Sequence, residues 1–346
     1  MNKLRLLLLP LTLIYWIATS VRNMLYNAGV LPQRSFDKPV LCVGNITVGG
    51  TGKTPLTEHI VRLLLSEGVR VGVVSRGYKR KSKGQVVASS APTAEEIGDE
   101  PCQMKLKFPT AEVVVDSNRG AAIDTAIGMG CEVVVMDDGM QHRSVRPHAI
   151  FLVVDHARPM WRDLPLPSGN LREDRIGRLR ANVIIINKCP ADMTKAQAER
   201  FMSHMSLNDD QRIFFCAIEY GNLRRADGST VSDEEAQMRG GVAVAGIGRP
   251  EPFFTEIDNR MATRRTKHMS YPDHHNYTEE DIKDILYELD QIGPDSVAVC
   301  TEKDSMRLPA IEGHETWILP IRLRVLFGQE EELDKTIMNT IKTKRQ

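Results

Sequence analysis

The chain carries no excess of either charge, because its 346 residues include 45 Lys and Arg against 45 Asp and Glu. A neutral chain creates no long-range field that would gather the phosphates of a nucleic acid. No internal repeat of the kind that builds a solenoid is present either. We therefore expect no nucleic-acid partner, and no segment points to a protein partner.

Paired cysteines are also missing. The six cysteines are scattered along the chain, and none of them forms a Cys-x-x-Cys pair. This spacing excludes a disulfide framework and a tetrahedral zinc site. We expect reduced and mostly buried thiols in a protein that faces the cytosol.

The N-terminal uncharged run, residues 6–21, is shorter than the roughly 20 apolar residues that span a bilayer, and Pro10 interrupts it. Three interpretations are open: a cleaved signal peptide, a buried core helix, or a helix that lies in the membrane interface. We favour the third, because Tyr15 and Trp16 suit the headgroup region and no acidic residue precedes Asp37. Residues 1–30 are thus expected to form a membrane-associated helix.

Beyond this segment, continuous apolar runs alternate with stretches long enough for helices. Such runs are typical of strands buried on both faces, so they predict an α/β fold whose mostly parallel sheet has helices on both faces. The expected strands are residues 39–45, 71–74, 112–116, 132–137, 150–155, 183–187, 242–247 and 296–301. The pattern weakens around residues 222–241, where we expect the linker. It would join a larger lobe, residues 31–225, to a smaller α/β lobe, residues 226–346, that ends in a helix.

A glycine-rich segment lies between the first expected strand and a helical pattern at residues 55–67. It matches the phosphate-binding loop G-x-x-x-x-G-K-[ST] except at its first position, and reads Thr47-Val48-Gly49-Gly50-Thr51-Gly52-Lys53-Thr54. The glycines let backbone N–H groups converge on phosphate oxygens, Lys53 reaches the terminal phosphates and Thr54 offers its hydroxyl to Mg²⁺. We call residues 47–54 the P-loop, and they predict a P-loop NTPase-like core that binds a nucleotide.

A Mg·nucleotide site also needs a carboxylate at the end of a neighbouring strand. Asp137 and Asp138 follow one of the expected strands, and Glu100 is a further candidate ligand of the ion. Taken alone, Asp-Asp-Gly is ordinary turn chemistry. Together with the P-loop it predicts a Mg²⁺ site.

Further short motifs continue this pattern along the chain. They are Ser75-Arg76-Gly77-Tyr78, Gly98-Asp99-Glu100-Pro101, Asp137-Asp138-Gly139-Met140-Gln141-His142, Leu171-Arg172-Glu173, Gly246-Ile247-Gly248-Arg249-Pro250, Asp273-His274-His275 and Thr301-Glu302-Lys303-Asp304. With these motifs in this order, the sequence closely resembles the tetraacyldisaccharide 4′-kinases of lipid A synthesis. It departs from the family pattern at residues 162–170 and at Met140, where the family usually has an aromatic residue.

The resemblance implies an ATP-dependent kinase that uses Mg²⁺ and phosphorylates the 4′-hydroxyl of a tetraacylated glucosamine disaccharide 1-phosphate. It also implies an N-terminal membrane helix, which would hold the enzyme peripherally on the cytoplasmic face of the bacterial inner membrane, at the inner-leaflet surface. Residues that follow a strand or match a family motif are the candidates for binding the acceptor. They are Arg76, Arg119, Gln141, His142 and Arg172.

Phosphoryl transfer to an alcohol needs a base that accepts the hydroxyl proton and cations that neutralise the transferring group. Asp99 is the candidate base, on its chemistry and on the family resemblance, and Lys53 is the candidate cation. The resemblance pairs Asp99 with a histidine of the Asp273-His274-His275 motif, and we prefer His274 to His275. Because these segments belong to different lobes, closure of the lobes would assemble the site.

Three other functions fit parts of the sequence. Residues 186–190 resemble the Asn-Lys-x-Asp motif of GTP-dependent switches, but Pro190 replaces the aspartate that reads guanine. A metal-dependent phosphoesterase would use Asp273 and its neighbouring histidines but would leave the P-loop unexplained. A non-catalytic nucleotide-binding module on a membrane would leave Asp99 without a role.

Overall fold

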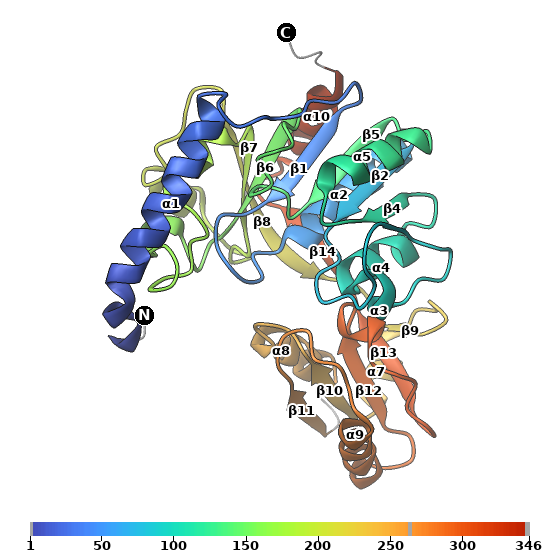
Figure 1. Ribbon diagram of the computed structural model, residues 1–346. Helices are drawn as coiled ribbons and strands as arrows, with labels where there is room; N and C mark the ends of the chain where they lie inside the picture. The colour runs from blue at the N-terminus through green and yellow to red at the C-terminus, as the bar shows by residue number, and fades with distance from the viewer. Residues whose placement is uncertain (1–2, 262–264, 343–346) are drawn as a thin grey trace.

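The computed structural model describes residues 3–261 and 265–342. The first two residues of the expected membrane segment and the last four of the expected C-terminal lobe therefore lie outside the described residues. Within the described ranges the chain forms two lobes, each built on its own sheet (Figure 1). The predicted α/β class with a mostly parallel sheet is confirmed.

The large sheet has parallel neighbours throughout except at its two edge strands, which are antiparallel. In spatial order its strands are β14 (Ile321–Val325), β8 (Arg212–Tyr220), β7 (Val183–Asn187), β6 (Ala149–Asp155), β1 (Val40–Gly44), β5 (Val133–Asp137), β2 (Val71–Ser75), β4 (Glu112–Val115) and β3 (Val86–Val87). The parallel strands end at one common edge. The P-loop after β1 and the acidic pair after β5 are therefore neighbours.

Helices cover both faces of this sheet because the strand residues alternate between them. Leu41 and Val43 pack on the face covered by α2 (Lys53–Ser66), α4 (Asp99–Lys107) and α10 (Glu330–Lys342). Val40 and Cys42 pack on the opposite face, under α5 (Arg119–Gly128), and α6 (Lys195–Met202) covers the neighbouring strands there. All six cysteines are free and buried, as expected.

The smaller lobe has a five-stranded sheet between helices of its own. Its strands are β11 (Thr266–Ser270), β10 (Gly241–Ala245), β12 (Val297–Thr301), β13 (Glu315–Leu319) and β9 (Arg224–Arg225). One face packs against α7 (Asp233–Met238) and α8 (Glu251–Arg260), and the other against α9 (Glu279–Ile292). The remaining short helices are η1 (Lys3–Leu8), α3 (Ala94–Ile97), η2 (Met160–Arg162), η3 (Arg175–Arg180) and η4 (Asp304–Met306).

The expected boundaries of the smaller lobe need correction at both ends. The residues expected as a linker, 222–241, supply β9 and α7 of the smaller lobe. At the other end, β14 returns to pair with β8 of the large sheet and α10 packs against α2 and β14. The lobes are thus joined at two adjacent points, where the Gly221 N–H donates to the Pro320 carbonyl at 2.9 Å. An edge strand pairs with a strand that is distant in the sequence. The alternating sequence of residues 321–325 therefore does not predict which of the two sheets this strand joins.

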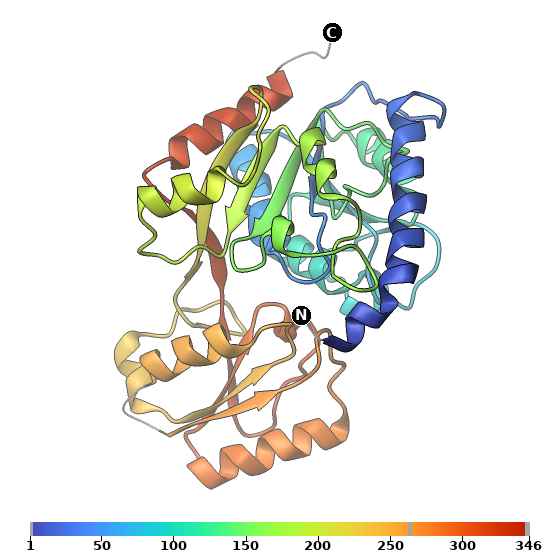
Figure 2. The same ribbon diagram turned by 90° about the vertical axis from the view of Figure 1, so that its left-hand side faces the viewer.

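The helix α1 (Leu9–Asn27) runs along the outside of the large lobe, on the side opposite α10 (Figure 2). Its one buried residue is Thr12, while Leu7 just before it and Ile14 within it are 77% and 64% exposed. This exposure excludes the core-helix interpretation. By length and composition, the helical stretch Arg5–Asn27 is long and apolar enough to cross a membrane.

Candidate active site

The P-loop joins β1 to α2 in the predicted position. Gly52 has a φ of 87°, and a Cβ there would lie 2.1 Å from Asn187 Nδ2, so the loop accepts only glycine at this point. The Asn187 amide donates to the carbonyls of Thr51 and Gly52 at 3.3 and 3.1 Å, so the end of β7 braces the loop. Within the described chain, the N–H groups of residues 49–52 donate to no backbone carbonyl. Together with the start of α2 they are available to phosphate oxygens.

The first two P-loop residues face another partner. Thr47 forms an isolated β-bridge with Leu171, and the Val48 N–H donates to the Asn170 carbonyl at 2.7 Å. The Val48 N–H is therefore already paired, whereas the hydrogen bonds of this bridge are made by Val48 and Ile46 and not by Thr47. After Thr47, the backbone N–H groups available to phosphate therefore begin at Gly49, and nucleotide contacts of Thr47 and of the Val48 side chain stay predictions.

Two adjacent carboxylates face Lys53 at the end of β5. Lys53 Nζ lies 3.4 Å from Asp138 Oδ1, and the Thr57 hydroxyl donates to Asp137 Oδ1 at 3.0 Å. Burial and the nearby Glu100 raise the pKa of Asp137 to about 7. Burial also acts to raise the pKa of Asp138, but Lys53 and Arg172 outweigh it and hold that pKa below its usual value. Near pH 7 the Asp137 carboxyl is therefore partly protonated, whereas Asp138 is ionised.

These residues fit a Mg²⁺ ion by their donor chemistry. In the described ranges no three His, Cys, Asp or Glu side chains already converge on one point. Mg²⁺ usually takes only one or two protein carboxylates and completes its shell with phosphate oxygens and water. Asp137 with its raised pKa is a carboxylate that a divalent cation would restore to the charged form. Thr54 and Glu100, each the second residue of its helix, are the other candidate ligands.

The raised pKa of Asp137 predicts a stability that depends on pH. The folded-state pKa of about 7 exceeds the ordinary value of 3.8. The protonated Asp137 carboxyl therefore contributes fully to the free energy of unfolding below about pH 4, and this contribution is lost as the pH rises through 7. Asp137→Asn should therefore raise the free energy of unfolding of the metal-free protein at pH 8, by at most about 4 kcal/mol. Thermal unfolding at pH 5 and pH 8 measures it. Asp138→Asn is the matched control and should destabilise at pH 8; equal effects of both changes would contradict the assignment.

Asp99 and His274 meet across the two lobes. Asp99 is the first residue of α4, and its Oδ2 lies 2.6 Å from Nδ1 of His274. His274 adopts a φ of 59°, and its N–H donates to the Gly246 carbonyl at 3.1 Å, which turns its ring toward the large lobe. This is the contact predicted between the candidate base and its preferred partner.

His275 lies elsewhere, although it was the second candidate for this role. Its Nε2 is 2.8 Å from Asp281 Oδ2 in the first turn of α9, and its ring stacks on Tyr271 at 4.8 Å between centroids. The left-handed backbone at His274 sends the two neighbouring side chains in different directions. His275 therefore supports the capping of α9 and is not brought to Asp99.

Three of the expected acceptor-binding residues influence one another electrostatically next to the carboxylate pair. Arg119 is 2% exposed, and burial lowers its pKa to about 10, opposed by Asp137 and Asp138. Burial, with Arg119 and Arg76 nearby, lowers the pKa of His142 to about 4. His142 is therefore neutral at physiological pH, and the two arginines make this region attractive to a phosphate group.

The other two expected acceptor-binding residues, Gln141 and Arg172, are engaged in hydrogen bonds and ion pairs with neighbouring residues. Arg172 Nη1 lies 3.1 Å from both carboxylate oxygens of Asp138 and donates to Gln141 Oε1 at 3.2 Å. The Gln141 amide donates to the Asn45 carbonyl at 2.8 Å and to Glu173 at 3.1 Å. In this arrangement both residues orient Asp138 and the loop rather than point freely at an acceptor.

A basic group at the outer side of the P-loop had no predicted role. Lys188 Nζ donates to the Gly50 carbonyl at 2.5 Å, and Arg158 Nη1 donates to the Val48 carbonyl at 3.4 Å. Arg158 and, from the smaller lobe, Arg249 pair with the buried Asp155 at 3.2 and 3.8 Å. Lys188 lies within residues 186–190, the segment that resembles the guanine-reading motif, so the sequence did mark this member of the basic group.

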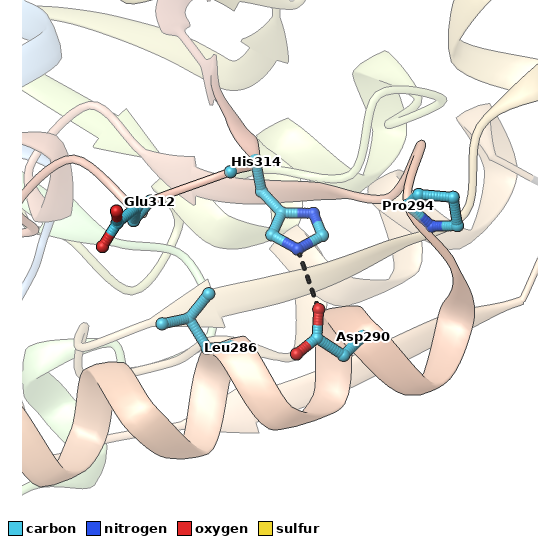
Figure 3. Close-up of a pocket in the computed structure, with 6 residues that line it drawn as sticks. Leu286, Asp290, Pro294, Glu312 and His314 are labelled. Carbon is cyan, nitrogen blue, oxygen red and sulfur yellow. Dashed lines mark hydrogen bonds and ion pairs between the residues drawn. The ribbon is translucent and has the colours of Figure 1, made fainter.

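A cavity of about 410 Å³ lies in the smaller lobe, apart from all these residues. It is lined by Leu286, Asp290, Pro294, Glu312, Gly313 and His314 (Figure 3). The His314 ring is held by Asp290 at 3.3 Å and by the Ser296 carbonyl at 3.0 Å. Because it contains none of the predicted site residues, we do not assign the reaction to it.

Comparisons with known proteins identify the family of this chain. A family model described as tetraacyldisaccharide-1-P 4′-kinase matches residues 4–342. The chain belongs to this kinase family. It is 38% identical over 350 residues to the tetraacyldisaccharide 4′-kinase of Porphyromonas gingivalis, covering 97% of each chain. It is 36% identical over 345 residues to that of Flavobacterium johnsoniae, covering 99% of this chain and 98% of the relative.

A solved structure of the same family matches the whole fold. The "apo" form of LpxK from Aquifex aeolicus in complex with ATP superposes with a TM-score of 0.77 at 29% identity, covering 98% of this chain and 99% of that one. The family resemblance drawn from the sequence motifs is thereby confirmed. The tetraacyldisaccharide-1-P 4′-kinase family also accounts for the order of the motifs along the chain.

Proposed function

We propose that this kinase transfers the γ-phosphate of ATP to the 4′-hydroxyl of a tetraacylated glucosamine disaccharide 1-phosphate, with Mg²⁺ as its metal ion. The observation that carries the proposal is the 2.6 Å contact between Asp99 and His274. It joins a carboxylate from the P-loop lobe to a histidine from the smaller lobe. A nucleotide-binding module without catalysis has no use for such a pair between its lobes.

In the proposed reaction Asp99 accepts the proton of the 4′-hydroxyl as that oxygen bonds to the γ-phosphorus. The bond from the γ-phosphorus to the β–γ bridging oxygen breaks, and ADP leaves. Lys53 and the N–H groups of residues 49–52 neutralise negative charge on the phosphates. Bound Mg²⁺, held by Thr54 and by Asp137 or Asp138, would supply further charge neutralisation. Arg76 and Arg119 attract a phosphate of the acceptor.

We also propose that residues 1–30 place the enzyme peripherally on the cytoplasmic membrane face, where a lipid acceptor lies. The polar atoms of α1 turn toward the protein: the Tyr15 hydroxyl donates to the Arg172 carbonyl and Trp16 Nε1 to Asp174, both at 2.7 Å. The opposite side of α1 is apolar and exposed, with Ile14 at 64% and Met24 at 59%. A one-sided apolar helix of this kind suits the membrane interface.

Removing the exposed apolar side chains should separate membrane binding from catalysis. Replacing Leu7, Ile14 and Met24 together by serine is expected to weaken binding to anionic lipid vesicles about 1,000-fold, because each side chain contributes about 1.5 kcal/mol when it is buried in the membrane. Activity on a detergent-dispersed acceptor should persist. Tyr287→Ser, which removes an exposed side chain from α9, is the control. Unchanged vesicle sedimentation of the triple variant would contradict the interfacial assignment.

One assay tests the proposed reaction directly. The protein is incubated with Mg²⁺, γ-labelled ATP and the acylated glucosamine disaccharide 1-phosphate, and the label is followed. Transfer of label to the lipid supports the proposal, whereas release to water only, or no turnover, overturns it. Repeating the assay with γ-labelled GTP tests the switch alternative, because a marked preference for GTP would favour it.

A further inference from the structure

Two cations of the smaller lobe surround the Asp99–His274 pair. Lys303 Nζ lies 3.0 Å from His274 Nε2 and 3.1 Å from Asp273 Oδ1. Arg307 Nε lies 3.2 Å from Asp99 Oδ1, the carboxylate oxygen that His274 does not contact. Lys303 belongs to a family motif to which the sequence assigned no chemistry, and Arg307 lies just beyond it.

The lysine determines which nitrogen of His274 carries the proton. A lysine ammonium has three donors and no acceptor, so His274 Nε2 must be the acceptor in this contact. The hydrogen of the neutral ring then lies on Nδ1, which donates to Asp99 Oδ2. Of the other groups around the ring, Asp273 Oδ1 is 4.0 Å from Nε2 and the Tyr78 ring packs edge-on at 5.2 Å between centroids. Lys303 therefore selects one tautomer.

Arg307 is held rigidly in place to face Asp99. Its side chain is 6% exposed, and Nη1 donates to the His275 carbonyl at 2.6 Å. Nη2 lies 3.5 Å from Asp304 Oδ1, and Asp304 is itself fully buried and bonded by the Thr301 and Tyr277 hydroxyls. The Nε and Nη2 atoms are buried without an aligned hydrogen bond, so they contribute chiefly charge. Arg307 thus places a fixed positive charge against Oδ1 of Asp99 and orients that carboxylate.

We propose that Lys303 and Arg307 are positioning residues for the proton transfer: Lys303 fixes the His274 ring with its Nδ1–H directed at Asp99, and Arg307 orients the Asp99 carboxylate through its second oxygen. This inference rests on the proposed function, in which Asp99 is the base. Since His274, Lys303 and Arg307 all come from the smaller lobe, a competent base exists only where the lobes are in contact. Asp99 by itself, on the large lobe, is an incomplete catalyst.

The tautomer is tested by NMR on the full chain with ¹⁵N-labelled histidine, using His274→Gln to assign the ring signals. In the wild type we expect a protonated Nδ1 and an unprotonated Nε2 for His274, and Lys303→Met should abolish this pattern. Lys79→Met is the matched control, because Lys79 reaches only the carbonyls of Asp273 and His274, at 3.4 and 3.3 Å. An unchanged His274 pattern in Lys303→Met overturns the role of Lys303. This readout needs no turnover, so it is independent of whether the proposed reaction occurs.

Kinetics test both residues in the transfer reaction. Lys303→Met and Arg307→Met should each lower kcat about 10- to 100-fold, with the KM values for ATP and acceptor within about twofold of wild type. Arg307→Lys keeps the charge, so its kcat should lie closer to that of the wild type than to that of Arg307→Met when the three are compared on a logarithmic scale. If kcat and the binding of ATP or acceptor fell together, the two residues would have a structural role and the proposal would be overturned. The proposal would also be overturned if Arg307→Lys unfolded at the wild-type temperature but did not recover kcat.

Discussion

Asp99→Ala is expected to lower kcat about 10³- to 10⁴-fold, while binding of ATP is retained. The loss follows because a positioned general base contributes this order of rate, and the other nearby carboxylate, Asp273, lies at Nε2 of His274, on the ring edge away from Asp99. Nucleotide binding should persist because Asp99 lies at the start of α4, whereas the phosphate-binding N–H groups belong to residues 49–54. Initial rates of label transfer and equilibrium binding of an ATP analogue measure the two quantities separately.

Two further variants make this experiment specific. Asp99→Asn keeps the shape of the side chain but cannot accept the proton, so its kcat should fall nearly as far. Glu95→Ala removes an exposed carboxylate from the preceding helix α3, where Glu95 pairs only with Lys81, and should leave kcat unchanged. If Asp99→Ala kept wild-type turnover, Asp99 would not be the base.

Lys53→Ala should lower kcat/KM for ATP about 10³-fold, through both weaker binding and slower transfer. Lys53 Nζ is the cation at the start of α2, and its side chain is only 12% exposed, so its charge is little screened by water. Loss of one such charge-stabilising group typically costs 10²- to 10³-fold in rate, and the weaker ground-state binding adds to it.

The comparison that separates charge from geometry is Lys53→Arg. Arginine keeps the charge but its broader planar head cannot occupy the same position between the loop and Asp138, so we expect partial activity at best. Steady-state kinetics over a range of ATP concentrations resolve kcat from KM. Full activity of Lys53→Ala would remove the P-loop from the mechanism.

Much of the large lobe was predictable because its signals are local. The continuous apolar runs at residues 183–187 and 133–136 are buried on both faces, and both are strands in the structure. The P-loop was recognisable because its glycines and Lys53 must occur at fixed spacing for a backbone to surround phosphate. Another local interaction is the capping of α9 by Thr278, whose hydroxyl accepts from the Asp281 N–H three residues later.

The contacts that the sequence did not predict involve partners distant in the sequence. The alternating residues 321–325 fit many edges, and only the packed structure shows that they extend the large sheet beside β8. Gln141 and Arg172 carry polar heads suited to a ligand, yet both are engaged by Asp138, Asn45 and Glu173. The residue type limits which partners a side chain can bind, and the tertiary structure determines which of these partners lie within reach.

The sequence by itself determined the glycine-rich loop after β1, the acidic pair at the end of β5 and membership of this kinase family, and it singled out Asp99 as the candidate base, because each depends on residue types at short, fixed spacing. Tertiary structure decided which histidine meets Asp99, since a left-handed turn at His274 directs one ring to the large lobe and leaves His275 on α9. It also decided that Lys303 and Arg307 complete that pair. The contacts of Asp99 with His274 and Arg307 join residues 175 or more positions apart, and only the packing of the two lobes against each other brings them together.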